Sequence, residues 1–138
     1  MIDIKITDEP LQVEKYFKRI TSDHSGCVNI FVGTVRADNM GKKVLYLEFE
    51  SYEDMAINEI KNIANAIKEK FNVKNILIHH RLGKVEVGEA PIIIAVSASH
   101  RREAIEATGY AIDTFKKSVP IWKKEVYEDG EAWVSAHP

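Results

Sequence analysis

Residues 91–120, PIIIAVSASHRREAIEATGYAIDTFKKSVP, join an apolar run directly to a long segment of helical periodicity. The first residues are apolar and mostly β-branched, which predicts a buried strand over 91–97. From His100 to about Val119, small and apolar residues recur every three or four positions, which predicts a helix with one buried face. We expect Ser99 to cap this helix, and Pro120 to end it because proline lacks an N–H group and restricts the residue before it.

Apolar runs and helical periodicity predict further elements of both kinds in the rest of the chain. They are strands over 1–6, 27–35, 44–51, 76–81 and 83–88, and helices over 10–20 and 52–71. The strands on either side of the turn at 37–42 are expected to pair as an antiparallel hairpin, with Leu45, Leu47 and Phe49 on one face.

The two ends of the chain complete this picture. Asp8 and Pro10 are typical of the cap and the first turn of a helix, and the tail over 121–134 carries a turn at Asp129-Gly130. We find no linker and no internal repeat. The order of the elements therefore predicts a single α+β domain over residues 1–138, with a mixed or mostly antiparallel sheet.

The composition restricts the classes of function. A net charge of −2 and a pI near 6.2 give no overall field that would attract nucleic acid or an anionic membrane, so any basic site must be local. The single cysteine, Cys27, cannot form an internal disulfide. No apolar run approaches the roughly 20 residues of a membrane span, and the charged residues near the amino terminus are unlike a signal peptide. We expect a cytoplasmic protein that binds neither nucleic acid nor membranes.

The start of the helix over 100–119 is a candidate anion site. The first N–H groups of a helix lack internal partners and carry partial positive charge. His100 and Arg101 add two basic side chains at the same place, which makes phosphate binding credible. The alternative is an ordinary capped helix whose basic side chains are solvated.

Lysines on both sides of Pro120 form a second candidate. Lys116 and Lys123 are separated by a Pro-Ile-Trp corner that could turn both toward one pocket, where a partly desolvated lysine can do acid–base work. The alternative is that lysines gather at a helix carboxyl end because its dipole favours them. Arg36, at the end of an apolar strand, is equally compatible with a functional role and with a solvated strand end.

Other chemistry-bearing residues favour structural roles. His79 and His80 are neighbours on a predicted strand and so face opposite ways, which does not suit a compact metal site. Cys27 opens an apolar strand and is expected to be a small buried residue rather than a nucleophile. The Gly83–Gly88 segment lacks the spacing of a phosphate-binding loop. We expect no metal and no cofactor.

Several short motifs occur in one order along the chain. They are Phe31-Val-Gly-Thr-Val-Arg36, Glu50-Ser-Tyr-Glu-Asp-Met-Ala56, His80-Arg-Leu-Gly83, Ser99-His-Arg101, Asp113-Thr-Phe-Lys116, Val119-Pro-Ile-Trp-Lys-Lys-Glu125 and Asp129-Gly-Glu-Ala-Trp-Val134. Together they resemble the large, catalytic subunits of molybdopterin synthase, the MoaE family. The resemblance extends over almost the whole chain.

This resemblance implies a fold, an activity and a set of partners. The fold would be an α/β hammerhead-type domain with an added β-rich subdomain, assembled as a homodimer. Each chain would bind one small ubiquitin-like subunit whose Gly-Gly tail carries a thiocarboxylate, giving a heterotetramer. The activity would be that of a sulfurtransferase that converts cyclic pyranopterin monophosphate to molybdopterin, in molybdenum cofactor biosynthesis.

The resemblance also assigns site residues by motif position. Lys116 corresponds to the essential lysine and Lys123 to a second catalytic lysine. Substrate binding falls on Thr34, Val35, Arg36, His100, Arg101, Lys124 and Glu125. An alternative from another class is a non-catalytic module that binds a ubiquitin-like tail or an anionic effector.

Helix geometry constrains how these residues can meet. Arg101 and Lys116 are 15 residues apart on one predicted helix, hence roughly 22 Å apart at ~1.5 Å per residue. A single pterin phosphate cannot easily contact both from one chain. We therefore expect each pocket to combine Lys116 and Lys123 of one subunit with His100 and Arg101 of the other.

Overall fold

The computed structural model describes residues 1–135, which form three helices and nine strands. In chain order the elements are β1 (Ile2–Thr7), α1 (Val13–Ile20), β2 (Cys27–Gly33), β3 (Asp38–Asn39), β4 (Lys42–Ser51), α2 (Glu53–Lys70), β5 (Val73–Arg81), β6 (Gly83–Glu86), β7 (Ile92–Ala98), α3 (Arg101–Ser118), β8 (Ile121–Tyr127) and β9 (Gly130–Ser135). The predicted end of the domain, residues 136–138, lies outside the described residues.

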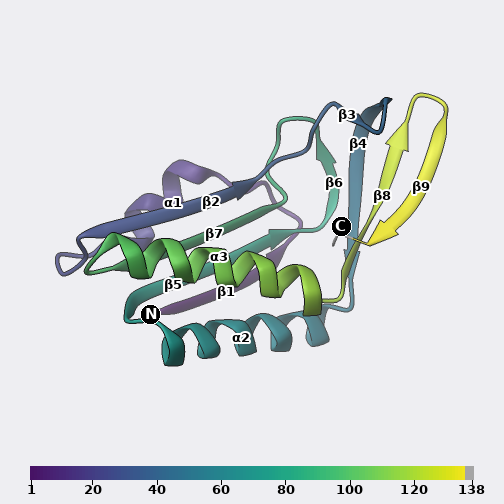
Figure 1. Cartoon of the computed structure of the whole chain (residues 1–138). Coiled ribbons are helices and arrows are strands. Elements are labelled where there is room, and N and C mark those ends of the chain that lie inside the picture. Colours follow the sequence, from purple (N-terminus) through teal and green to yellow (C-terminus); the bar gives the residue numbers. More distant parts are fainter. Residues whose placement is uncertain (136–138) are drawn as a thin grey trace.

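The strands form two sheets (Figure 1). One has the order β1-β5-β7-β2 and is mixed, because β1 runs parallel to β5 while the other neighbours are antiparallel. The other contains β3, β4, β6, β8 and β9, all paired antiparallel, and stands at the carboxyl end of α3. The predicted α+β class with a mixed sheet is confirmed, although the strands divide between two sheets.

Helices cover both faces of the four-stranded sheet (Figure 1). Side chains alternate along each strand, so neighbouring residues belong to different cores. Ile76 and Ile78 of β5 pack in the main core with α2 and α3, whereas Leu77 packs with α1 in a smaller core. The sheet is thus buried on both sides, which explains why β7 is almost continuously apolar.

The buried residues of the two long helices lie at the helical spacing that the sequence predicts. In α2 the buried residues are Ala56, Ile60, Ile63, Ala64 and Ile67. In α3 they are Ala104, Ala107, Thr108, Ala111 and Phe115. The predicted end before Pro120 is confirmed, since α3 stops at Ser118. Within residues 1–135 no helix combines the length and apolarity needed to cross a membrane.

Both predicted helix caps are wrong. Helix α3 begins at Arg101, with an extended His100 as N-cap and no side-chain cap. The backbone of Ser99 instead lies close against the loop before β2: a Cβ on Gly26 would lie 2.3 Å from the Ser99 carbonyl oxygen. Helix α1 begins at Val13, after an N-cap residue that likewise makes no side-chain cap, so neither Asp8 nor Pro10 starts it.

The predicted hairpin of 27–35 with 44–51 is also wrong. Strand β2 pairs with β7 in the four-stranded sheet, and β4 pairs with β3, β6 and β8 in the other. The chain leaves β2 at Gly33 and crosses between sheets before the tight β3–β4 turn, where Met40 and Gly41 both have positive φ, 51° and 80°. Adjacent apolar strands of similar length therefore gave a misleading local signal.

One side chain of β4 faces the opposite way from its prediction. Leu47 and Phe49 are buried as expected, but Leu45 is 39% exposed. The pairing of β4 with β8 shifts register between Val44 and Tyr46, and this irregularity buries Val44 in place of Leu45.

Candidate active site

The candidate site lies where α3 passes into β8, at the junction of the two sheets (Figure 1). Helix α3 ends in a compact corner, in which the Val119 N–H bonds the Phe115 carbonyl and the Ile121 N–H bonds the Val119 carbonyl. The Tyr52 N–H donates to the Pro120 carbonyl at 3.3 Å and ties this corner to the start of α2. Lys116, in the last turn of α3, is therefore held close to the first residues of β8.

Strand alternation sorts the charged residues of β8 onto two faces. Lys123 pairs with Phe49 and Glu125 pairs with Leu47, and both partners on β4 are buried. Cross-strand partners point to the same side of a sheet. Lys123 and Glu125 therefore face inward, toward the core and the end of α3, and the residue between them faces away.

Lys123 is a partly buried cation. Its Nζ lies 3.8 Å from Oε1 of Glu125, and its side chain is 26% exposed. Burial lowers the pKa of Lys123, the nearby charges of Lys116 and Arg36 lower it further, and Glu125 opposes them. Since these charges act on one ammonium group, the fold brings Arg36, Lys116, Lys123 and Glu125 into one cluster.

Glu125 is the buried acceptor of this cluster, with a side chain only 7% exposed. Its Oε2 accepts hydrogen bonds from Asn39 Nδ2 at 2.8 Å and from the hydroxyl of Tyr127. Burial raises the pKa of the carboxyl, but these hydrogen bonds and the charges of Lys123 and Arg36 outweigh burial and leave the pKa below its ordinary value. Glu125 is thus held as a carboxylate.

Arg36 reaches the cluster from the segment that crosses between the sheets. Val35 is 4% exposed, and its backbone is fixed by two hydrogen bonds: its N–H donates to the Glu89 carbonyl at 3.1 Å, and its carbonyl accepts from Gly88 at 2.8 Å. This clamp orients the exposed Arg36 beside Lys123 and Glu125. Thr34, on the other side of Val35, is exposed.

Besides Thr34 and Val35, which precede Arg36 in the chain, three more predicted site residues lie outside the cluster. Lys124, on the outer face of β8, pairs with Glu48 at 3.0 Å, and the hydrogen bond to that carboxylate raises its pKa. His100 and Arg101 are exposed at the opposite end of α3. Arg101 and Lys116 do lie on one uninterrupted helix, so they are roughly 22 Å apart along its axis at ~1.5 Å per residue.

Sequence reasoning missed the two residues that hold Glu125. Tyr127 was detectable in principle, because Lys123, Glu125 and Tyr127 recur at every second position of one strand. Asn39 gave no such signal, since its contact with Glu125 spans 86 residues. In the described part of the chain, no group of three or more His, Cys, Asp and Glu side chains is arranged to hold a metal ion.

The cluster has a definite chemical capacity. The cluster combines three basic side chains with one fixed carboxylate, so its net charge is positive and favours a bound anion. Lys123 gives up its proton more readily than an ordinary lysine, because burial and two neighbouring cations disfavour its charged form.

Comparisons with known proteins identify the family of this chain and agree with its fold. A family model described as MoaE protein matches residues 6–118. The molybdopterin synthase catalytic subunit of Homo sapiens is 49% identical over 130 residues, which cover 94% of this chain and 69% of that protein. The structure of molybdopterin synthase from Staphylococcus aureus has a TM-score of 0.88 at 40% identity, covering 94% of each chain.

A more distant structure shares the fold. It is the protein–protein complex of subunits 1 and 2 of molybdopterin-converting factor from Helicobacter pylori, with a TM-score of 0.78 at 22% identity, covering 99% of this chain and 93% of that one. The family model and the relatives above 30% identity decide the assignment. The chain belongs to the MoaE family of molybdopterin synthase catalytic subunits, sulfurtransferase enzymes of molybdenum cofactor biosynthesis.

Proposed function

We propose that the Arg36–Lys116–Lys123–Glu125 cluster is the site where sulfur enters a cyclic pyranopterin monophosphate. The sulfur donor is the thiocarboxylated C-terminal tail of a small ubiquitin-like subunit, and two tails act in succession to complete the dithiolene. The observation that carries this proposal is Lys123, a partly buried cation whose pKa is lowered by burial and by two neighbouring cations.

The residues of the cluster divide the work. Arg36 and the helix-end lysine Lys116 neutralise the substrate phosphate and the charge that develops when the cyclic ester opens. Lys116 also donates a proton to the oxygen that sulfur displaces, with Lys123 supporting it electrostatically. Glu125 fixes Lys123 through their ion pair at 3.8 Å. Val35 and Thr34 contribute by placing Arg36.

The partner tail enters from the exposed side of the α3–β8 corner. Tyr52 and Trp122 form an edge-to-face pair there, with ring centroids 5.0 Å apart, and Tyr52 is 65% exposed. A complex of two subunits of molybdopterin-converting factor is known for the Helicobacter pylori relative. By the same arrangement this chain binds one small subunit at each site, in a cytoplasmic heterotetramer built on a homodimer. The four-stranded sheet with its helices corresponds to the hammerhead-type domain, and the five-stranded sheet to the β-rich subdomain.

Each pocket is completed by the second subunit of the homodimer. His100 and Arg101 lie one helix length from Lys116, so they serve the pocket of the other chain, across a two-fold axis. Lys124, which pairs with Glu48 and Glu131 on the outer face of β8, contributes to substrate binding only through the strand that carries Lys123.

The first test is reconstitution with a thiocarboxylated small subunit, followed by mass spectrometry of the pterin product. Lys116→Ala should abolish product while the protein stays folded and still binds the small subunit. Lys117→Ala is the matched control, because it removes an exposed lysine from the same helical turn, and it should stay active. Near-normal turnover by Lys116→Ala would remove that residue from the mechanism.

The second test is subunit complementation. One inactive homodimer carries His100→Ala and Arg101→Ala, and another carries Lys116→Ala. After exchange at equal amounts, half of the dimers are mixed and each contains one intact pocket, so activity should return to roughly a quarter of wild type. Proven exchange without recovery would mean that one chain forms the whole pocket.

A further inference from the structure

A cavity lies on the opposite side of the four-stranded sheet from α2 and α3 (Figure 1). It has a volume of about 470 Å³ and is bounded by α1, by the loop before it and by β1 and β5. Ligand pockets for small molecules commonly have roughly 300–1,000 Å³. The cavity shares no lining residue with the Arg36–Lys116–Lys123–Glu125 cluster.

The rim of this cavity is strongly basic. Lys5 of β1 and Lys15, Lys18 and Arg19 of α1 line it, against one acidic residue, Glu9. Within residues 1–135, Lys5, Lys15 and Lys18 form no ion pair closer than 4 Å with a carboxylate. In a chain of net charge −2, such a concentration of unpaired cations around one hollow favours an anion with more than one charge.

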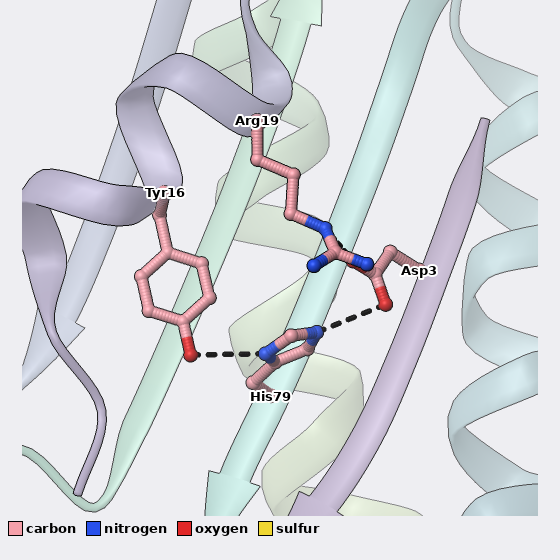
Figure 2. A network of polar contacts seen from close by, with 4 residues as sticks. All are labelled: Asp3, Tyr16, Arg19 and His79. Carbon is pink, nitrogen blue, oxygen red and sulfur yellow. Dashed lines mark hydrogen bonds and ion pairs between the residues drawn. The ribbon is translucent and has the colours of Figure 1, made fainter.

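The floor of the cavity is a buried hydrogen-bonded chain, which Figure 2 shows. His79 is 3% exposed; its Nδ1 lies 2.9 Å from the Tyr16 hydroxyl and its Nε2 lies 3.0 Å from Asp3 Oδ1. Asp3 also pairs with Arg19. Because a carboxylate can only accept, Nε2 carries the proton, and Nδ1 of neutral His79 accepts from the Tyr16 O–H.

This chain can reverse its outer hydrogen bond. If His79 gains a proton, its Nδ1–H donates to the Tyr16 oxygen, and the Tyr16 hydrogen is released toward the cavity. Burial lowers the pKa of His79, with Arg19 and Lys5 acting in the same direction against Asp3. The free protein therefore favours neutral His79, whereas an anion that accepts the Tyr16 hydrogen favours the protonated state.

We propose that the cavity between α1 and the β1–β5 edge is a binding site for a small anion bearing more than one phosphate charge, held by Lys15 and Lys18 at the rim and by the Tyr16 hydroxyl at the floor. Binding is coupled to proton uptake by His79. The site is separate from sulfur transfer, because the four-stranded sheet lies between the cavity and the α2–α3 face.

Binding is tested with inorganic pyrophosphate and ¹⁵N-labelled protein carrying Lys123→Ala, which weakens anion binding at the other basic site. As pyrophosphate is added, the amide signals of residues 15–19 should shift, and all of these shifts should fit a single dissociation constant. Lys15→Ala with Lys18→Ala should weaken that binding about tenfold, as expected for the loss of two exposed ion contacts. The matched control, Lys61→Ala with Lys70→Ala on α2, should leave it unchanged. Equal weakening by both pairs, or no shifts in α1, would refute the site.

The coupling is tested with sulfate, which does not titrate between about pH 5 and 8, so that only the protein changes protonation. NMR of the imidazole nitrogens should show the His79 titration moving to higher pH when sulfate is saturating. Tyr16→Phe should remove this movement while the Lys15 and Lys18 contacts retain weaker binding. An unchanged His79 titration in the wild-type protein at saturation would refute the role of the floor.

Discussion

Replacing Glu125 by glutamine isolates the electrostatic role of the buried carboxylate. The amide has nearly the same shape, and its oxygen can still accept the hydrogen bonds that Asn39 and Tyr127 now donate to Oε2. The variant should therefore fold, but Lys123 loses the one negative charge that opposes Lys116 and Arg36.

The size of the effect follows from the distance. Lys123 Nζ and Glu125 Oε1 are 3.8 Å apart, so Coulomb's law gives about 1 kcal/mol in bulk water and about 4 kcal/mol at an effective dielectric constant of about 20. About 1.4 kcal/mol corresponds to one pH unit. Protonated Lys123 should therefore be lost about one to three pH units earlier as the pH rises.

The pH dependence of kcat/KM in the reconstituted reaction measures this change. If charged Lys123 supports the transfer, the alkaline limb of the profile should move to lower pH in Glu125→Gln, with a smaller loss of rate on its acid side. Glu131→Gln is the control, because it removes the carboxylate that lies 3.7 Å from Lys124 on the other face of β8. An alkaline limb that stays in place in Glu125→Gln, or moves equally in both variants, would refute the reasoning.

Three further predictions concern stability and are read by urea denaturation. Gly26→Ala should destabilise the fold by about 1–3 kcal/mol, because its Cβ would meet the Ser99 carbonyl oxygen at 2.3 Å; an unaffected midpoint would contradict this contact. Gly109→Ala, in open space within α3, should instead stabilise by roughly 0.5–1 kcal/mol, and a loss of stability would show that the position is packed. Burial holds the pKa of His79 below its ordinary 6.5, so below about pH 6.5 the unfolded chain takes up a proton that the folded chain does not. The free energy of unfolding should therefore decrease as the pH is lowered through that window, and it should decrease less steeply in His79→Gln. The same dependence on pH in both proteins would exclude His79 as the cause.

The elements that local periodicity encodes were the predictable ones. Apolar residues recur at helical spacing over about five turns of α2, so the burial of Ile60, Ile63 and Ile67 could be predicted without any knowledge of the sheet that they contact. The buried strand β7 was equally clear, because a strand covered on both faces is apolar throughout. The corner at Pro120 was predictable from the chemistry of proline alone.

Pairings between distant segments were not encoded locally. No local pattern in β2 or β4 indicates that the two strands belong to different sheets. The burial of Val44 instead of Leu45 depends on an irregularity in the pairing of β4 with β8. The same limit applies to the site. Lys116 and Lys123 are close in sequence and could be grouped, whereas the place of Arg36 depends on contacts with residues 88 and 89 that only the folded chain makes.

The position of the cluster links its chemistry to the way the sheets are joined. Lys116 comes from a helix end, Arg36 from the crossing between sheets and Lys123 from the five-stranded sheet. Each segment is fixed by its own backbone contacts, so three cations can be held together without relying on one another. Glu125 reduces their repulsion, and the remaining positive charge is what an anionic substrate would neutralise. A concentration of positive charge can therefore be local in a chain whose net charge is negative, which is why composition alone gave no sign of it.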